Sequence, residues 1–161
     1  MTVSVSSIDA AITQLKDYKA RLKDAETRIV RRMAEDGAEQ AKSLVDYMDA
    51  VDTGELRGSI TGEANGNRGR IVAGTDHAAF VEFGTGVVGA RNPHVRNPGT
   101  GPSPVGWAYD VNNHGDAGWM YPGDDGHLHW TKGMPSRPYM YDTSRILEEA
   151  APDIVREEIQ K

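Results

Sequence analysis

The chain has 161 residues, a net charge of −6 and no cysteine. Its length suits one domain with its own core, and the missing cysteines exclude disulfides and thiolate metal sites. The acidic balance argues against nucleic acid as the main ligand, because duplex binding needs an excess of Lys and Arg. No segment resembles a signal peptide or reaches the ~20 apolar residues of a membrane span. We therefore expect a protein that is soluble and cytosolic when it is made.

A long helical region is predicted at residues 7–49. Its apolar residues are spaced three, four or seven positions apart, which places them on one side of a helix: Ile8, Ile12, Leu15, Leu22, Ile29 and Met33. Such a thin, Ala-rich face is typical of packing on a sheet or a neighbouring subunit. Lys19 and Glu26 interrupt a regular heptad, so a free-standing coiled coil is the weaker interpretation. The region forms one helix or two, with a break near 18–23 or at Gly37. A basic cluster within it is interleaved with acidic residues, which predicts a solvated face: Arg28, Arg31 and Arg32.

Two antiparallel strands are predicted at about 57–64 and 69–74. Polar and apolar residues alternate there, and Asn65-Gly66 permits the positive φ of a tight hairpin turn. A short helical turn should follow from Thr75-Asp76 and end at Gly84. The last element is a helix at about 141–160, in which Pro152 predicts a kink or a division into two shorter helices.

Residues 87–134 differ in composition from the rest of the chain. They hold all three Trp and four of the five His, which is too aromatic for a disordered linker. We expect an ordered, irregular insertion. Within it, residues 119–121 and 128–130 should pair as a second hairpin, and residues 90–106 should form a mobile loop.

The second hairpin also offers a candidate metal site. His127 and His129 would point to the same face of a strand, and Asp125 could add an oxygen ligand. Further ligands would have to come from Asp124, His114 or Asp116. The alternative is an ordinary polar turn, since Asp-Asp-Gly is common turn chemistry. A metal-dependent hydrolase is therefore only an alternative, because no complete ligand set, nucleophile elbow or His-Glu-x-x-His motif occurs. We predict no cofactor and no enzymatic activity.

The aromatic residues of the insertion are too many for a small loop to bury alone: Trp107, Tyr109, Trp119, Tyr121 and Trp130. Aromatic side chains are enriched at the centres of protein interfaces, which favours a docking role. Two alternatives remain open. The residues could form a packed second mini-core, or they could be the platform of a carbohydrate-binding decoration.

Three phrases of the sequence occur in a fixed order. They are Asp52-Thr53-Gly54-Glu55-Leu56-Arg57-Gly58-Ser59-Ile60, then Ala78-Ala79-Phe80-Val81-Glu82-Phe83-Gly84-Thr85-Gly86, and finally Arg137-Pro138-Tyr139-Met140. In this order they resemble the neck proteins of tailed bacteriophages, which are called tail-component, tail-completion or head–tail joining proteins. The resemblance covers about residues 44–83 and 136–159. It implies a single domain over 1–161, with a family-like core at 53–86 and 135–161 and an insertion at 87–134.

The expected fold class is α+β: a long N-terminal helical region, a small antiparallel sheet, a C-terminal helix and an irregular aromatic-rich insertion. The resemblance implies a structural virion protein of a tailed phage or prophage, assembled in the host cytoplasm and located in the neck or tail. Such a protein forms a homo-oligomeric ring, often six-fold. Its partners would be other neck, portal-side or tail-tube proteins, with no membrane and no sequence-specific nucleic acid.

The resemblance also suggests structural residues. Arg57 and Glu82 both belong to the family-like phrases, and we expect them to form an ordered ion pair. Phe80 and Phe83 would lie on one side of the short helix and anchor it to the sheet.

Overall fold

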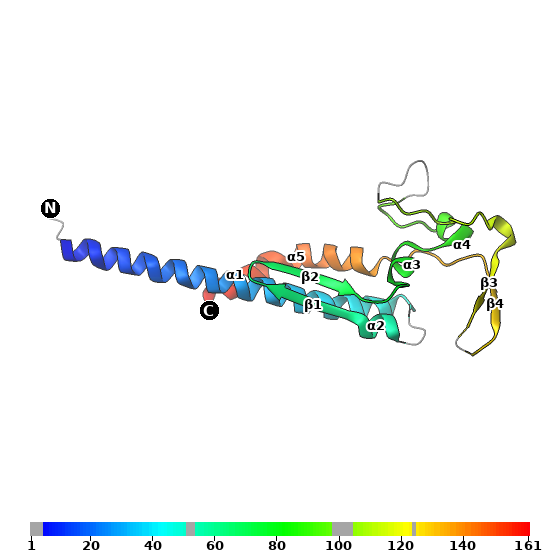
Figure 1. The fold of residues 1–161 in the computed structure, drawn as a ribbon. Helices are drawn as coiled ribbons and strands as arrows, with labels where there is room; N and C mark the ends of the chain where they lie inside the picture. The colour runs from blue at the N-terminus through cyan, green and yellow to red at the C-terminus, as the bar shows by residue number, and fades with distance from the viewer. Residues whose placement is uncertain (1–4, 51–53, 98–104, 124) are drawn as a thin grey trace.

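The computed structural model describes residues 5–50, 54–97, 105–123 and 125–161. Its elements are α1 Val5–Tyr47, α2 Glu55–Ser59, β1 Ile60–Asn65, β2 Arg68–Ala73, α3 Ala78–Phe83, α4 Gly86–Arg91, the 3₁₀ turn η1 Gly115–Ala117, β3 Trp119–Pro122, β4 Leu128–Thr131 and α5 Tyr139–Gln160. The predicted α+β class is confirmed, with two separate two-stranded antiparallel sheets. In Figure 1, β1–β2 and α5 lie along the C-terminal half of α1, and the β3–β4 hairpin stands at the end of the molecule opposite the N-terminus.

α1 is one unbroken helix, so neither predicted break occurs. Gly37 instead allows close approach of two neighbours. A Cβ at this position would come within 2.7 Å of side-chain carbons of both Ile71 in β2 and Leu147 in α5. Gly62 in β1 has the same role, since its Cβ would lie 2.1 Å from the carbonyl oxygen of Ala34. Small residues on both surfaces therefore let the sheet and α5 lie close against α1.

The hydrophobic core lies where α1, the β1–β2 sheet, α3 and the start of α5 meet. Its buried members are Ala38, Ala41, Val45, Leu56, Ile60, Ala78, Val81 and Tyr139. Tyr139 is the largest of the fully buried side chains, and burial raises the pKa of its phenol well above the ordinary value. The first turn of α5 is therefore fixed to the core by a large aromatic side chain.

The first hairpin is confirmed, with a later start than predicted. Ile60 pairs with Ala73 and Asn65 pairs with Arg68, which leaves Gly66-Asn67 as the two-residue turn. Residues 55–59, predicted in part as strand, form the short helix α2 instead. Leu56 is buried in the core while its neighbours are not, a spacing that a single helical turn satisfies. Asp52 and Thr53 of the first family-like phrase lie outside the described residues.

α5 is a single helix that contains Pro152, so the predicted division does not occur. Pro152 is exposed. Because proline has no backbone N–H, the carbonyl four residues before Pro152 has no donor within the helix. On the exposed side of α5 this carbonyl can bond to water, which lowers the cost of an internal proline.

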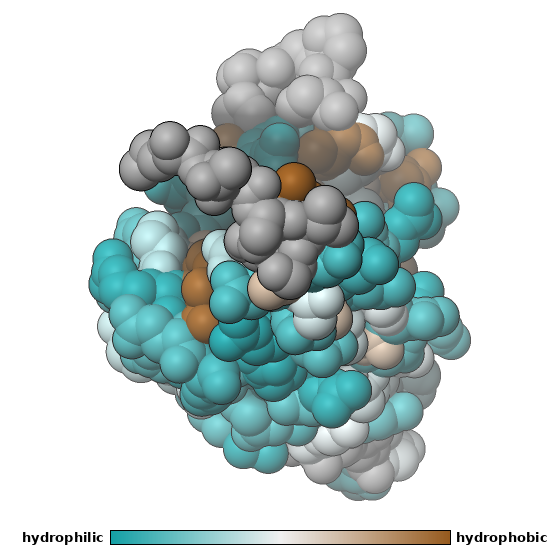
Figure 2. Space-filling view, turned by 90° about the vertical axis from the view of Figure 1, so that its left-hand side faces the viewer, coloured by the Kyte–Doolittle hydropathy of each residue, from teal (hydrophilic) through white to brown (hydrophobic). Residues whose placement is uncertain are grey.

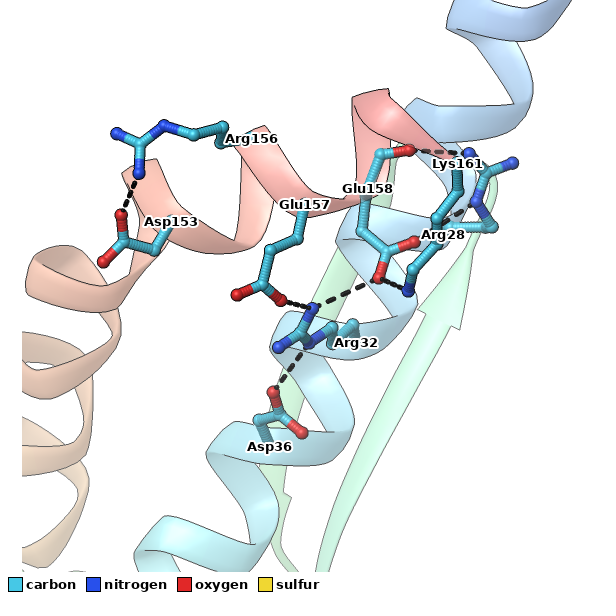
Figure 3. A network of polar contacts seen from close by, with 8 residues as sticks. All are labelled: Arg28, Arg32, Asp36, Asp153, Arg156, Glu157, Glu158 and Lys161. Carbon is cyan, nitrogen blue, oxygen red and sulfur yellow. Dashed lines mark hydrogen bonds and ion pairs between the residues drawn. The ribbon is translucent and has the colours of Figure 1, made fainter.

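A cluster of charges joins the end of α5 to the middle of α1 (Figure 3). Arg32 Nη1 lies 2.7 Å from Glu157 Oε2 and 3.2 Å from Glu158 Oε1, and Arg28 Nη2 donates to the Glu158 carbonyl at 2.8 Å. The Glu158 side chain is only 4% exposed. The Lys161 ammonium, with the guanidinium groups of Arg32 and Arg28, lowers the pKa of the Glu158 carboxyl. The prediction of a solvated face holds only in part, because Arg28 and Arg32 stay 41% and 34% exposed while both bond to Glu158 of α5.

Among the residues that the structure describes, no helix is long and apolar enough to cross a membrane.

Candidate functional site

The Glu82 carboxylate connects α3 to the start of α5. Glu82 is 7% exposed. Its Oε2 accepts the backbone N–H of Met140 at 2.8 Å, and its Oε1 accepts that of Tyr141 at 3.0 Å. These are N–H groups of the first helical turn, which have no partner inside the helix. Pro138, at the N-cap position, makes no side-chain cap bond, so Glu82 supplies the missing acceptor and its negative charge suits the helix dipole.

His94 joins the insertion to the same carboxylate. Its Nε2 lies 3.2 Å from Glu82 Oε1, and its Nδ1 accepts the backbone N–H of Arg96 at 3.1 Å. Since Nδ1 acts as an acceptor, the proton of the neutral ring lies on Nε2, which donates to Glu82. Burial raises the pKa of Glu82, and the backbone N–H groups of Met140 and Tyr141 and the His94 ring oppose that rise. The carboxylate therefore holds three elements together at one buried point.

The predicted Arg57–Glu82 ion pair is wrong. Arg57 Nε instead bonds Asp46 Oδ2 at 2.9 Å, and both side chains are about half exposed. The physical reason is the unpredicted helix α2, which sets Arg57 beside the last turns of α1. Glu82 bonds the N-terminus of α5 instead.

Phe80 and Phe83 were expected to anchor the short helix to the sheet. In the structure they contact the insertion instead. The Phe83 ring stacks on Trp107 with centroids 5.3 Å apart, and Phe80 lies 5.6 Å from the same indole. Trp107 Nε1 also donates to the Gly84 carbonyl at 3.0 Å. Trp107 therefore belongs to a small cluster at the base of the insertion.

Tyr109 closes this cluster. Its hydroxyl donates to the Asn97 carbonyl at 2.6 Å and accepts the backbone N–H of His94 at 3.0 Å. Among the alternatives left open by the sequence, the second mini-core thus describes the base of the insertion. His94 and Asn97, each 2% exposed, are parts of it that sequence reasoning missed. A lone His in an irregular segment carries no periodic signal that could have identified it.

The predicted second hairpin is confirmed as β3–β4. Trp119 pairs with Thr131, Met120 with Trp130, Tyr121 with His129 and Pro122 with Leu128. Because side chains alternate across a strand, four apolar residues share one face: Met120, Pro122, Leu128 and Trp130. We call this set the hairpin face. Three of its members are strongly exposed: Met120 by 52%, Trp130 by 57% and Leu128 by 66%.

The opposite face of the hairpin is partly covered. Trp119 packs on His114, with ring centroids 4.8 Å apart.

On the hairpin face itself, the indole of Trp130 is fixed by a hydrogen bond, since its Nε1 donates to the Ala117 carbonyl at 3.0 Å. The indole of Trp130 is thus held in one place while most of its apolar surface stays exposed.

The candidate metal ligands only partly come together. His129 Nε2 lies 2.9 Å from Asp125 Oδ1, and this contact is the main cause that lowers the pKa of Asp125. His127 reaches Asp125 through its backbone N–H, at 3.0 Å. Asp124 lies outside the described residues. His114 pairs instead with Asp110, and Asp116 with Arg91. Within the described parts of the chain, no three His, Cys, Asp or Glu side chains gather as a metal site would require.

A buried core that presents an exposed apolar hairpin is typical of a structural protein that acts by association. Residues 9–84 match the family HK97-gp10_like, described as "Bacteriophage HK97-gp10, putative tail-component". Just under half of the chain is therefore similar to a family of phage tail components, and the resemblance found in its sequence is confirmed. No curated protein and no solved structure matches the chain.

Proposed function

We propose that this chain is a phage tail component that joins head and tail as a subunit of the neck or tail-completion ring, and that it acts by protein–protein association without catalysing a reaction. The family match over residues 9–84 supports a structural role in the virion. The proposed partners are further copies of the chain, in a ring such as a hexamer, and the neighbouring neck, portal-side or tail-tube proteins.

The observation that carries the proposal is the hairpin face. Contiguous apolar surface of this kind is costly to leave in water, and it commonly marks a site of association. The hairpin is placed away from the core at the far end of the molecule (Figure 1). Its base is fixed through the Trp107 cluster and the Glu82–His94 contact. Such an arrangement presents a preformed surface, so little ordering is needed when a partner binds.

Charge supports the same role. Between Arg96 and Lys132 the chain contains four Asp and no Lys or Arg: Asp110, Asp116, Asp124 and Asp125. A ring built from such subunits would repel DNA that passes through its lumen, and it would favour a basic partner surface by steering.

The hairpin face can be tested by complementation. A phage or prophage that lacks this gene is supplied with a variant carrying Met120→Asp and Leu128→Asp, and complete particles are counted by electron microscopy. We expect few joined particles, because the added charges oppose burial against a partner. Tyr121→Asp, on the other face of the same hairpin and 45% exposed, is the matched control and should complement. Normal particle yield from the double variant would contradict the proposed role of the hairpin face.

A further inference from the structure

Residues 8–24 of α1 extend beyond the core (Figure 1), and their last part lines a pocket with the end of α5. Every residue from 8 to 24 is exposed, and Ala25 is the first buried one. This segment, which we call the arm, is about 25 Å long at ~1.5 Å per residue. Five large apolar side chains lie along it: Ile8 (49% exposed), Ile12 (44%), Leu15 (67%), Tyr18 (53%) and Leu22 (38%). At about 100° per residue they occupy a sector of roughly 120°, which we call the arm stripe.

Further along α1, the arm stripe is continued by two residues at the edge of the face that packs in the core. Gly37, which approaches both β2 and α5, and Leu44, which packs against the core cluster, lie on the same side of the helix as Leu15. α5 ends at Gln160, where Leu22 and Tyr18 line a shallow pocket together with Ile159. Seen from the N-terminal end, the surface is mostly hydrophilic, with hydrophobic groups exposed in narrow strips (Figure 2). A helix laid on the arm stripe would therefore lie next to the end of α5.

We propose that the arm stripe binds the arm stripe of a second copy of this chain, with the two helices antiparallel. The spacing of the stripe is symmetric about Leu15, since successive members are four, three, three and four residues apart. With Leu15 on the two-fold axis, Ile8 lies opposite Leu22 of the second copy, and Ile12 lies opposite Tyr18. Ile8 of the second copy then reaches the pocket beside Ile159.

The charges along the stripe favour the same arrangement. Asp9, Lys16 and Lys23 follow one edge of the stripe. In an antiparallel pair this edge faces its own counterpart, so Asp9 approaches Lys23 of the second copy at both ends, whereas Lys16 meets its own counterpart near the two-fold axis. A parallel pair would bring Lys23 towards Arg21, which lies near the other edge, and would oppose like charges.

Lys19, which interrupts the heptad pattern, is also accommodated. In the antiparallel register it lies opposite Ala11 of the second copy. The small side chain leaves room for the aliphatic part of Lys19, whose ammonium can extend into water.

The interface is small and closed. Two arms of this length bury less than the ~1,200 Å² of a standard stable interface, so we expect a reversible dimer that needs at least roughly micromolar protein. The contact is isologous, so each arm stripe is covered by one partner and no further copy can bind to it. It does not involve the hairpin face, so its test can fail separately from the complementation test above.

Sedimentation equilibrium of the full chain over a range of concentrations tests the pairing. We expect a monomer–dimer equilibrium whose dissociation constant rises more than about tenfold in Leu15→Asp, because two carboxylates would meet on the two-fold axis. Leu15 is 67% exposed, so the thermal melt of the dilute variant should match the wild type. Ala10→Asp adds the same charge on the opposite side of the arm, and it should dimerise as the wild type does. A chain that stays monomeric, or self-association that Leu15→Asp leaves unchanged, would overturn the proposal.

Cysteine cross-linking tests the orientation. The chain has no native cysteine, so single-cysteine variants report one position each. An equimolar mixture of Ile8→Cys and Leu22→Cys, distinguished by mass with a tag on one of them, should oxidise mainly to the mixed dimer. Equal or greater yields of the two like-with-like dimers would refute the antiparallel register.

Discussion

Replacing Glu82 tests how the C-terminal helix is fixed to the core. Its carboxylate accepts the N–H groups of Met140 at 2.8 Å and Tyr141 at 3.0 Å, and it lies 3.2 Å from Nε2 of His94. Glu82→Ala leaves these three donors in a buried site, where each unsatisfied group costs about 1–3 kcal/mol. Burial raises the pKa of Glu82, which means that desolvation of the carboxylate destabilises the folded wild type and offsets part of the stabilisation from these three bonds. We therefore expect a loss of about 3 kcal/mol in the free energy of unfolding, below the sum of three full penalties.

Urea unfolding followed by far-ultraviolet circular dichroism measures this loss. A loss of this size corresponds to roughly 6–12 °C in the melting temperature of a chain of this length. Glu82→Gln should lose about half as much, because its amide oxygen still accepts one N–H while its NH₂ group faces another donor. Glu149→Ala, which removes an exposed carboxylate of α5, is the control and should change little. If Glu82→Ala stayed within about 0.5 kcal/mol of the wild type, the carboxylate would not be the cap of α5.

Three further outcomes follow from the structure. Arg57→Ala and Asp46→Ala should each cost less than about 1 kcal/mol, because their ion pair is half exposed; a double-mutant cycle would measure the coupling, and a value above ~2 kcal/mol would show a buried pair. Trp107→Ala should lower the melting temperature clearly, since the indole stacks on α3 and bonds the Gly84 carbonyl. Trp130→Ala, which removes a mostly exposed indole, should lower the melting temperature far less. Equal effects would contradict the distinction between a packed base around Trp107 and an exposed hairpin face. The pKa of Glu158 is lowered in the folded chain, so its stabilising effect is present above its ordinary value of 4.5 and is lost as the pH falls through its folded value. Acid titration of the wild type should therefore show a loss of stability that Glu158→Gln does not show, and parallel titrations would refute the role of that carboxylate.

Regular elements were predictable because their signals are local. The stripe from Ile8 to Met33 predicted α1 within two residues at each end, and Asn65-Gly66 located the first turn. The second hairpin followed from two short aromatic runs on either side of a Pro-Gly-Asp-Asp-Gly segment. Short α2 was missed, because one buried Leu in five residues gives no periodicity.

Partners of charged residues were not predictable in the same way. Glu82 was singled out as a partner of Arg57, but its bonds are to backbone N–H groups of α5 and to a ring in the insertion. No local pattern in the sequence indicates either contact. Arg28 and Arg32 illustrate the same limit, since an i,i+4 pattern describes neighbours on one helix and says nothing of Glu158 in another. Gly37 was interpreted as a weakness of the helix, whereas its role depends on how close β2 and α5 approach.

Electron microscopy of lysates from a phage or prophage that lacks this gene tests whether the chain joins head to tail. We expect DNA-filled heads and separate tails in place of joined particles, with wild-type yield restored when the intact chain is supplied from a plasmid. Complete, infectious particles in the absence of the gene would contradict a role in joining head and tail.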